Sequence, residues 1–256
     1  MIIRSASAHD AGTIVWLFRR GIEAAHRPLT IAGCPGYEHY IRSHIQLRNR
    51  GGDHRYWVAE VEGEVVGAIE FRSIGCIWFL NNIHVDGNKR GLGIGRGLLA
   101  KAARYGLGIG HTELALDVLE TNVRAAGWYS SLGLREQTRA SYCSMPLPEH
   151  VPSAKGTIAN LPQAVKLFHD FGFATVVVRG VGEHEVGILG QRWYRLSKDD
   201  IVDDILALEA LRVFDPDRRL LLITATGVKE GRPWDLLARS IRMSGALQDV
   251  VGVLER

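Results

Sequence analysis

The sequence predicts a mixed α/β (α+β) fold divided into two domains, at residues 1–148 and 157–256. Strand-like and helix-like patterns alternate along the chain, which indicates sheets covered by helices. A glycine-rich segment at residues 88–97 joins an apolar, strand-like run to a helical pattern. A polar segment with proline and glycine, residues 149–156, separates the patterns into two groups and is the expected linker. A chain of 256 residues is long enough for two cores.

The first domain is expected to contain a mixed sheet flanked by helices. Ser7 and Asp10 have the spacing of a capping box at the start of a helix. Alternating apolar residues on both sides of Glu62-Gly63 indicate a hairpin. The expected elements are a strand at 2–5, helices at 8–25 and 37–50, strands at 56–61, 65–71 and 77–85, a helix at 96–106, a strand at 113–118, a helix after Asn122, and a hairpin of strands starting at 133 and at 142–145.

The second domain is expected to be a smaller α/β unit. Its predicted elements are a helix at 161–171, strands at 174–179 and 186–195, a helix at 198–212, a strand at 219–225, a helix at 233–243 and a strand at 249–254. Four aspartates, Asp199, Asp200, Asp203 and Asp204, lie in the first turns of the helix at 198–212, where they complement the helix dipole. No histidine or loop glycine is placed to complete a metal shell there, so we expect no metal.

Composition indicates a soluble globular protein in a reducing compartment. The net charge of +3 suits an anionic cofactor, but the basic residues are too scattered to indicate nucleic-acid binding. The three cysteines, Cys34, Cys76 and Cys143, are too far apart for a disulfide framework or a CxxC metal pair. We therefore expect a cytoplasmic protein. We expect no signal peptide, and no apolar run approaches the length of a membrane span.

The glycine-rich segment has the chemistry of an anion cradle. Gly91, Gly93 and Gly95 leave little side chain between a ligand and the backbone N–H groups, and glycine readily adopts positive φ. A helix that begins here adds its unpaired N–H groups, and Arg90 and Arg96 add full charges. The pattern matches neither the P-loop nor the dinucleotide-binding fingerprint. It indicates either a pyrophosphate site or a plain tight turn.

Two motifs give this sequence a family resemblance. The first is Arg90-x-x-Gly93-x-Gly95. The second, Asn122-x-x-Ala125-x-x-x-Tyr129-x-x-x-Gly133-Leu134, follows the buried strand-like run at 114–118. Their order and separation resemble those of the GNAT-type N-acetyltransferases. The resemblance covers residues 1–148 and implies a mixed sheet that binds acetyl-CoA between two splayed strands.

The resemblance also implies roles for individual residues. The backbone of the central strand would pair with the pantetheine, the glycine loop would hold the pyrophosphate, and Asn122 would contact the cofactor arm. Tyr129, two helical turns beyond Asn122, would lie near the thioester sulfur. The implied cofactor-binding residues are Ile83, His84, Val85, Arg90, Gly91, Leu92, Gly93, Ile94, Gly95, Arg96, Asn122 and Tyr129.

The candidate catalytic residues are Tyr129, Glu70 and His84. A phenol that hydrogen-bonds or protonates the departing thiolate lowers the barrier, which is the role expected of Tyr129; the alternative is a packed aromatic ring. Glu70 and His84 are candidate bases, and either could instead be structural. Many relatives carry a glutamate where this chain has Asn81 or Asn82, and an amine that is already neutral needs no strong base.

The acceptor pocket of the family lies in the helix–loop–helix region that corresponds to residues 8–50. In this chain the region holds five polar or aromatic candidates: Tyr37, His39, Tyr40, Arg42 and His44. A solvated helix face with a few buried rings explains the same residues. The acceptor therefore cannot be read from this segment.

The function that we infer is transfer of an acetyl group from acetyl-CoA to a primary amine of a small molecule or peptide, by direct attack on the thioester. One alternative is a transferase of the same fold whose donor is another acyl-CoA or an aminoacyl-tRNA. Apart from such a tRNA donor, we expect no nucleic-acid partner. The other is a module that binds acyl-CoA without catalysis. No membrane partner is expected.

The second domain has no assigned role at this stage. It could cover the acceptor site or serve a homodimer. The spacing of Ala164, Phe168 and Gly172 echoes that of Ala125, Tyr129 and Gly133, although no second glycine loop precedes it. We favour an accessory domain, and a degenerate GNAT repeat stays open.

Overall fold

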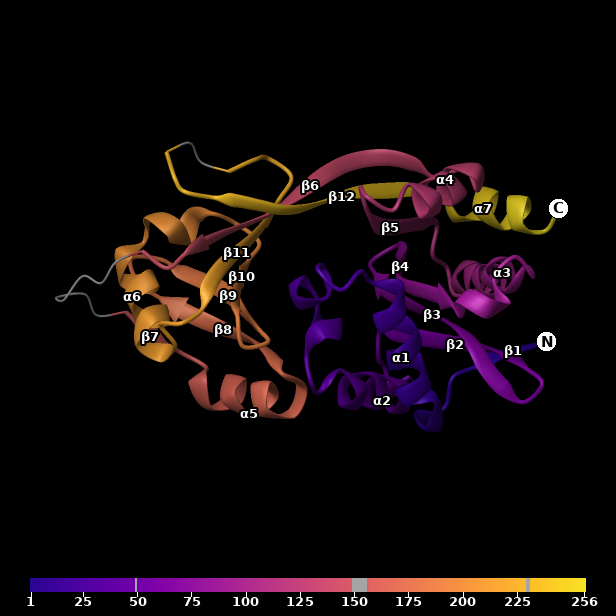
Figure 1. Cartoon of the computed structure of the whole chain (residues 1–256), viewed down its shortest axis with the longest axis horizontal. Coiled ribbons are helices and arrows are strands. Elements are labelled where there is room, and N and C mark those ends of the chain that lie inside the picture. Colours follow the sequence, from indigo (N-terminus) through magenta and orange to yellow (C-terminus); the bar gives the residue numbers. More distant parts are fainter. Residues whose placement is uncertain (49, 149–155, 229–230) are drawn as a thin grey trace. The chain divides into compact units, whose positions relative to one another are not determined.

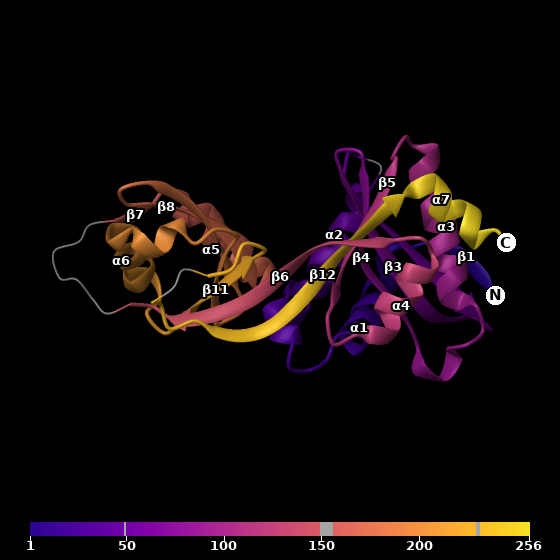
Figure 2. The ribbon, with the colours of Figure 1, turned by 90° about the horizontal axis from the view of Figure 1, so that it is seen from above.

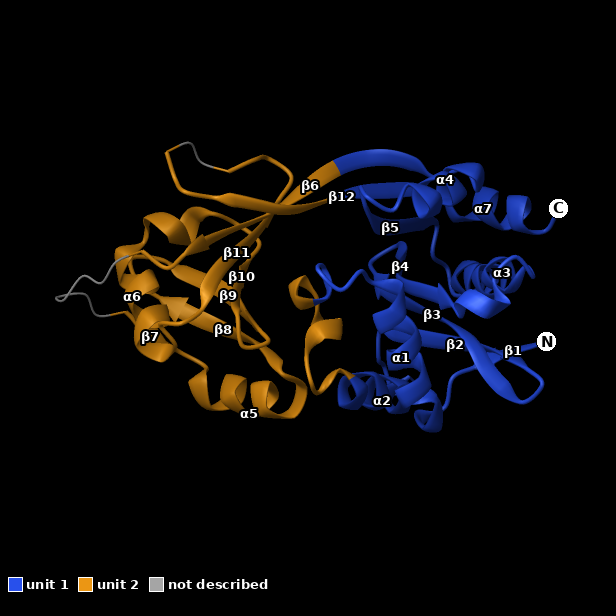
Figure 3. Cartoon of the chain, in the orientation of Figure 1, with its two compact units in different colours: residues 1–27, 38–138, 240–256 blue, residues 28–37, 139–239 orange. Residues whose placement is uncertain are grey.

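A computed structural model of the chain describes residues 1–48, 50–148, 156–228 and 231–256 (Figure 1). The chain divides into two compact units, each built from segments that are distant in sequence. Unit 1 holds residues 1–27, 38–138 and 240–256, and unit 2 holds residues 28–37 and 139–239 (Figure 3). Apart from Gly156, the predicted linker lies outside the described residues.

Unit 1 contains a mixed sheet with the strand order β1-β2-β3-β4-β5-β12. Neighbouring strands are antiparallel except β4 and β5, which are parallel. The strands are β1 (Ile2–Ser5), β2 (His54–Val61), β3 (Glu64–Ile74), β4 (Ile77–Val85), β5 (Glu113–Leu119) and the end of β12 (Asp235–Ala246). The predicted mixed sheet is therefore confirmed.

Helices pack on the sheet of unit 1. α1 contacts β3 and β4, while α3 contacts β2, β3 and β4. α7 lies beside α3, as Figures 1 and 2 both show, and it also contacts β5. The helices of unit 1 are η1 (Ala8–Asp10), α1 (Ala11–Gly21), α2 (Tyr37–Leu47), η4 (Gly87–Lys89), α3 (Ile94–Gly108), α4 (Val123–Ser131) and α7 (Leu247–Leu254). No helix of the described chain has the length and apolarity needed to cross a membrane.

A β-bulge at Asn81 decides which way the end of β4 faces. Glu70 of β3 pairs with Asn82 but the next residue, Phe71, pairs with Leu80, so Asn81 is the extra residue. Side chains alternate along a strand, and one inserted residue reverses the alternation. Before the bulge, Trp78 packs in the core with α3. After it, His84 points to the other face and contacts Gly21 at the end of α1.

Unit 2 contains the strand order β6-β11-β10-β9-β8-β7. Its neighbours are antiparallel except β10 and β11. Its elements are η2 (Arg27–Leu29), η3 (Ile31–Gly33), β6 (Arg135–Pro146), β7 (Thr157–Ile158), α5 (Leu161–Phe171), β8 (Phe173–Arg179), β9 (Glu183–Leu189), β10 (Trp193–Leu196), η5 (Asp200–Asp203), α6 (Ile205–Phe214) and β11 (Arg219–Thr224). η2 and β6 begin within unit 1.

Unit 2 repeats part of the element order of unit 1. In each unit, three consecutive antiparallel strands come first, β2-β3-β4 in unit 1 and β8-β9-β10 in unit 2. The third of these strands is followed by a helix and then by a strand that is parallel to it. These elements are β4-α3-β5 in unit 1 and β10-α6-β11 in unit 2. By this order α5 corresponds to α1, because it precedes the antiparallel strands. Ala125-x-x-x-Tyr129 lies on α4 and the similar spacing Ala164-x-x-x-Phe168 lies on α5, so the two motifs are on helices that do not correspond to each other.

The C-terminal segment differs most from the sequence prediction. Residues 233–243, predicted as a helix, belong mainly to β12, whose Ser240–Ala246 pairs with Leu119–Glu113 of β5. Pairing with a strand more than 100 residues away overrides local helical preference. Residues 249–254, predicted as a strand, belong to α7. Its apolar residues Leu247, Val250, Val251 and Leu254 have helical spacing and are buried in the core of unit 1.

Two further predictions need correction. The hairpin expected at residues 133–145 is one continuous strand, β6 (Arg135–Pro146), because residues 135–145 contain no glycine, proline, asparagine or aspartate to form a tight turn. The compact units also differ from the predicted domains 1–148 and 157–256. Residues 240–256 complete the sheet and core of unit 1, and residues 28–37 belong to unit 2, where Leu29 and Cys34 pack with Trp193.

Close packing of α3 on the sheet gives a stability prediction. A Cβ added at Gly106 would lie 2.6 Å from Cδ1 of Trp78, whose ring is fully buried and donates a hydrogen bond to the Ala102 carbonyl at 3.0 Å. We expect Gly106→Ala to lower the free energy of unfolding by about 1–3 kcal/mol. The control is Gly108→Ala in the same helix, where a Cβ meets nothing within 4 Å. Urea denaturation should show equal stability of the two variants if the packing argument is wrong.

Candidate active site

The parallel strands β4 and β5 separate part-way along their length. Their pairing runs from Ile77–Glu113 to Leu80–Leu116 and stops there, although both strands continue. Beyond this point, residues 82–85 keep their pairing with β3, and β5 keeps its pairing with β12. The edge of β4 that faces β5 is therefore open for backbone hydrogen bonds to an extended ligand.

A cavity of about 600 Å³ within unit 1 lies at this separation. Its size is typical of a cofactor site. It is lined by the end of β4, the glycine loop, the start of α4 and the end of α1. The lining residues are Gly21, Glu23, Ile83, His84, Val85, Lys89, Arg90, Gly91, Gly93, Ile94, Gly95, Arg96, Leu119, Thr121, Asn122, Arg124, Ala125, Trp128 and Tyr129. All the residues expected to bind the cofactor line it except Leu92.

The glycine loop presents backbone donors to the cavity. Gly91 has φ 81° and Gly93, the N-cap of α3, has φ 74°, a conformation in which residues with side chains are strained. The Gly97 N–H donates to the Gly93 carbonyl at 2.9 Å. The N–H groups that precede it in the first turn have no intrahelical acceptor. Together with the helix dipole, they form an anion site.

Four cations, Lys89, Arg90, Arg96 and Arg124, line the cavity, against one carboxylate, Glu23. Two of the guanidinium groups are held in place by carbonyl groups. Nε of Arg90 donates to the Val85 carbonyl at 3.2 Å, and Arg96 donates to the Val253 carbonyl of α7 at 2.6 Å. The cavity therefore favours an anion, and the C-terminal helix helps to position one of its charges.

His84 lies between the cavity and α1. Its imidazole is buried against Gly21, where an added Cβ would come within 2.7 Å of Nδ1. Burial, together with the positive charges of Arg90 and Arg20, lowers the pKa of His84 to about 4. The ring is therefore neutral at physiological pH and can accept a proton.

Asn122 and Tyr129 lie on α4 and line the cavity. The Asn122 side chain caps the helix, because its Oδ1 accepts the Ala125 N–H at 3.2 Å; its amide NH₂ is left to donate. Tyr129 is 7% exposed, and burial raises the pKa of its phenol above the usual value. The phenol is consequently a donor throughout the neutral range. Among the described residues, its hydroxyl has no hydrogen-bond partner.

Glu70 lies outside the cavity lining. It is buried and receives hydrogen bonds from the Tyr56 hydroxyl at 2.8 Å and the Asn82 amide at 2.6 Å, and it bonds to His54 at 2.8 Å. Burial alone would raise the pKa of Glu70, but these hydrogen bonds outweigh it and hold the pKa below its usual value. Of the two candidate bases, only His84 contacts the cavity. Leu92, the expected loop residue outside the lining, has an exposed side chain.

Sequence reasoning missed several lining residues. Lys89 precedes Arg90 directly, and Arg124 follows the Asn122 cap, so both could have been found from their neighbours. Gly21 and Glu23 carry no such signal. They reach the cavity only because α1 ends against β4.

Residues 22–134 match the model of the acetyltransferase (GNAT) family. This segment therefore has the sequence pattern of a GNAT acetyltransferase domain. The match begins at the end of α1 and ends after α4, so it contains both motifs and most of the cavity lining. A search of curated proteins found no match.

Solved structures extend the likeness to both units. A tandem GNAT protein from the clavulanic acid biosynthesis pathway is similar over 96% of this chain and 98% of its own, with 15% identity and a TM-score of 0.65. A putative acetyltransferase from Pyrococcus horikoshii is similar over 96% and 89%, with 16% identity and a TM-score of 0.60. A GCN5-related N-acetyltransferase from Sphaerobacter thermophilus covers 96% and 95%, with 11% identity and a TM-score of 0.59. At this identity they share the fold, which makes the second unit GNAT-like.

The environment of His84 gives a titration prediction. NMR of the imidazole in the ligand-free protein should show a pKa near 4, because burial and two guanidinium groups oppose its protonation. Saturation with CoA should raise this pKa, since a bound diphosphate offsets the charge of Arg90. The imidazole resonance of His84 is assigned as the one that is missing from the spectrum of the His84→Gln variant. A midpoint near that of a free imidazole in the ligand-free protein would contradict the burial argument.

Proposed function

We propose that this protein is an acetyl-CoA-dependent N-acetyltransferase acting on a primary amine of a small molecule or peptide. The observation that carries the proposal is the cavity where β4 and β5 separate, with the first turn of α3 and four basic residues at its wall. A nucleotide thioester has two parts that match these features. Its diphosphate suits the backbone donors and charges, and its extended arm suits the open edge of β4.

The residues of the cavity fit CoA on physical grounds. Gly91 and Gly93 adopt positive φ, so the loop can turn its N–H groups toward a bound phosphate. The four cations compensate the charge of a diphosphate. Ile83 and Val85, on the open edge, offer backbone groups to the pantetheine, and Asn122 offers its amide. Bound acetyl-CoA would supply an activated acyl group.

Tyr129 is the proposed proton donor to the departing thiolate. Its phenol lines the cavity and remains protonated, because burial raises its pKa. A thiol of pKa about 8.5 is a moderate leaving group, and a positioned donor contributes about 10²–10⁴-fold to such a step. Its hydroxyl makes no competing hydrogen bond within the described chain.

His84 is the proposed acceptor of the amine proton. The ring is neutral at physiological pH, lines the cavity and lies on the strand whose open edge would hold the thioester arm. Within the part of the chain that the structure describes, neither cysteine nor serine lines the cavity, which supports direct attack by the amine rather than an acyl-enzyme. Glu70 is the second candidate base and would act through a water molecule, because its side chain lies outside the cavity lining.

Unit 2 contributes no second cofactor site to the proposal. The segment between β10 and α6, residues 197–204, has four aspartates and no glycine. The carboxylate of Asp204 accepts the Ala207 N–H at 3.1 Å and the Gly182 N–H at 2.9 Å, so the start of α6 is already occupied by a negative charge. A phosphate would be repelled there. One CoA per chain is therefore expected.

Calorimetry tests cofactor binding. We expect the wild-type protein to bind one CoA per chain. Gly93→Ala should weaken binding by about 10-fold, because the side chain strains a backbone that must present its N–H groups. Gly63→Ala is the matched control, since Gly63 also has positive φ, at 85°, but lies in the β2–β3 turn. The absence of binding at millimolar CoA would rule out the transferase proposal.

Thiol release from acetyl-CoA with a panel of amines tests the catalytic role of Tyr129. Tyr129→Phe should lower kcat by about 10²-fold, because the leaving thiolate loses its proton donor, while the affinity for CoA stays within about twofold. Tyr105→Phe is the control: this hydroxyl lies on α3 and accepts a hydrogen bond from Arg55 at 3.3 Å. CoA binding without turnover of any acyl-CoA or amine would favour the non-catalytic binding module instead.

A further inference from the structure

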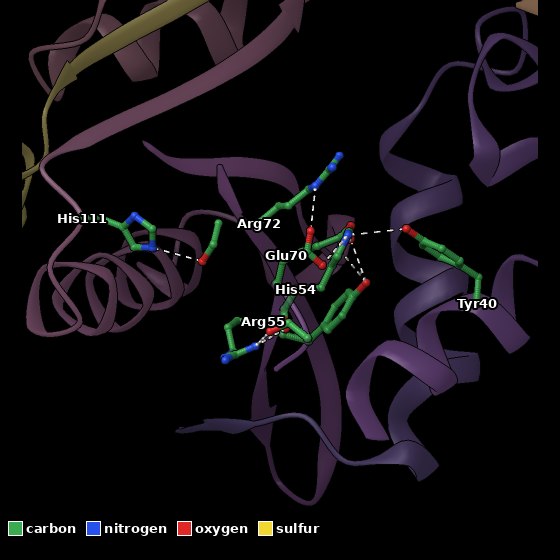
Figure 4. Close-up of polar contacts among 10 residues, drawn as sticks. Tyr40, His54, Arg55, Glu70, Arg72 and His111 are labelled. Atoms are coloured by element: carbon green, nitrogen blue, oxygen red, sulfur yellow. Dashed lines mark hydrogen bonds and ion pairs between the residues drawn. The ribbon is translucent and has the colours of Figure 1, made fainter. Parts of the chain in front are cut away.

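A second cluster of polar side chains lies where α2 faces the sheet of unit 1, and it does not line the cavity. His44, Asp53 and His54 each offer one ligand atom, and these atoms lie within 4.8 Å of one another. Figure 4 shows His54 with Glu70 on one side and Tyr40 of α2 on the other. Two histidines and a carboxylate are a ligand set that divalent transition metals prefer.

His54 is held in the orientation of a metal ligand. Its Nδ1 lies 2.8 Å from Oε1 of Glu70, a buried carboxylate that can only accept, so Nδ1 carries the proton. The lone pair of the ring is then on Nε2, away from Glu70. A carboxylate that fixes the ring through its other nitrogen is the usual support for a metal-binding histidine.

Glu70 is suited to this supporting role. Both of its oxygens are engaged: Oε1 also accepts the Tyr56 hydroxyl at 2.8 Å, and Oε2 accepts the Asn82 amide at 2.6 Å. These bonds fix the carboxylate, and with it the ring of His54. The bulge at Asn81 turns the amide of Asn82 toward this face of the sheet.

Asp53 lies near Nε2 of His54, the ring nitrogen that does not contact Glu70. Its Oδ1 lies 3.7 Å from Nε2, and its Oδ2 bonds to Nε of Arg72 at 3.2 Å. Two ligands at about 2.0–2.1 Å from a tetrahedral zinc lie about 3.4 Å apart. The observed separation is therefore close to that of a zinc site and too long for a hydrogen bond.

His44 supplies the third ligand. Its ring centroid lies 4.2 Å from that of His54, and its Nδ1 is buried without a hydrogen-bond partner among the described residues. Buried polar atoms are rarely left unpaired in folded proteins. A cation between the two rings would satisfy both.

We propose that His44, Asp53 and His54 bind one zinc ion, with Glu70 as the residue that positions His54. The site departs from the expectation of no metal, and it does not depend on the proposed acetyl transfer. Three protein ligands leave a fourth position for water. The Tyr40 hydroxyl, 3.5 Å from Nε2 of His54, is placed beside that position. The ion would fasten α2 to β2 and to the loop before it.

Metal titration of the chelator-treated, full-length protein tests the site. We expect one equivalent of Zn²⁺ to bind in competition with a chromophoric chelator, and Co²⁺ to give the strong visible absorption of a tetrahedral complex. His44→Ala and Asp53→Asn should each weaken binding by at least about 100-fold, and Glu70→Gln by about 10–100-fold. The same concentration of Zn²⁺ should raise the Tm of the wild type and should raise the Tm of His44→Ala and Asp53→Asn much less.

His39→Ala is the matched control, because this histidine lies on the same helix and is exposed. It should bind Zn²⁺ as the wild type does. The Asp53 side chain is 44% exposed, so Asp53→Asn tests the site if circular dichroism shows that His44→Ala does not fold. The proposal is overturned if the wild type shows no saturable uptake at micromolar Zn²⁺, or if Asp53→Asn binds zinc with unchanged affinity.

Discussion

The separation of β4 and β5 is the constraint on which the rest of unit 1 depends. Parallel pairing ends at Leu80 and Leu116 because each strand is held on its other side, β4 by β3 and β5 by β12. The last residues of β4 then have backbone groups without a strand partner, and such groups need water or a ligand. The glycine loop follows directly, so the backbone edge and the anion site form one surface. The C-terminal segment, through β12, is thus part of what keeps the cavity open.

A single inserted residue lets β4 serve two sites. Without the bulge at Asn81, the side chains of Asn82 and His84 would face the apolar core under α3. With it, His84 faces α1 and the cavity, and Asn82 completes the hydrogen bonds of Glu70. The polar network around His54 and the proposed proton acceptor therefore depend on the same irregularity. Bulges beside active sites have this effect of re-aiming side chains.

The two units show how one element order can leave the N-terminus of a helix open to an anion or cap it with a carboxylate. Both units place a helix between two parallel strands, and the N-terminus of such a helix attracts anions. In unit 1 the start is built from Gly93 and flanked by arginines. In unit 2 it is capped by the carboxylate of Asp204, which also bonds to His184 at 3.0 Å. The second unit thus keeps the fold while its helix start is satisfied internally.

The features that the sequence by itself predicted depend on residues that are close together in the chain. The positive-φ glycines with the arginines beside them, and the Asn122 cap with its helix, are each formed by residues close together in the chain. The glycine loop, β4 and the resemblance to GNAT acetyltransferases could therefore be predicted from the sequence. The end of the chain could not: the helix predicted at 233–243 and the strand predicted at 249–254 are both wrong, since β12 forms by pairing with β5 and local propensity is too weak to oppose that pairing. His44, His54 and Glu70 likewise come together only when α2 folds onto the sheet. Contacts between residues far apart in sequence leave no periodic pattern, and only the tertiary structure decided them.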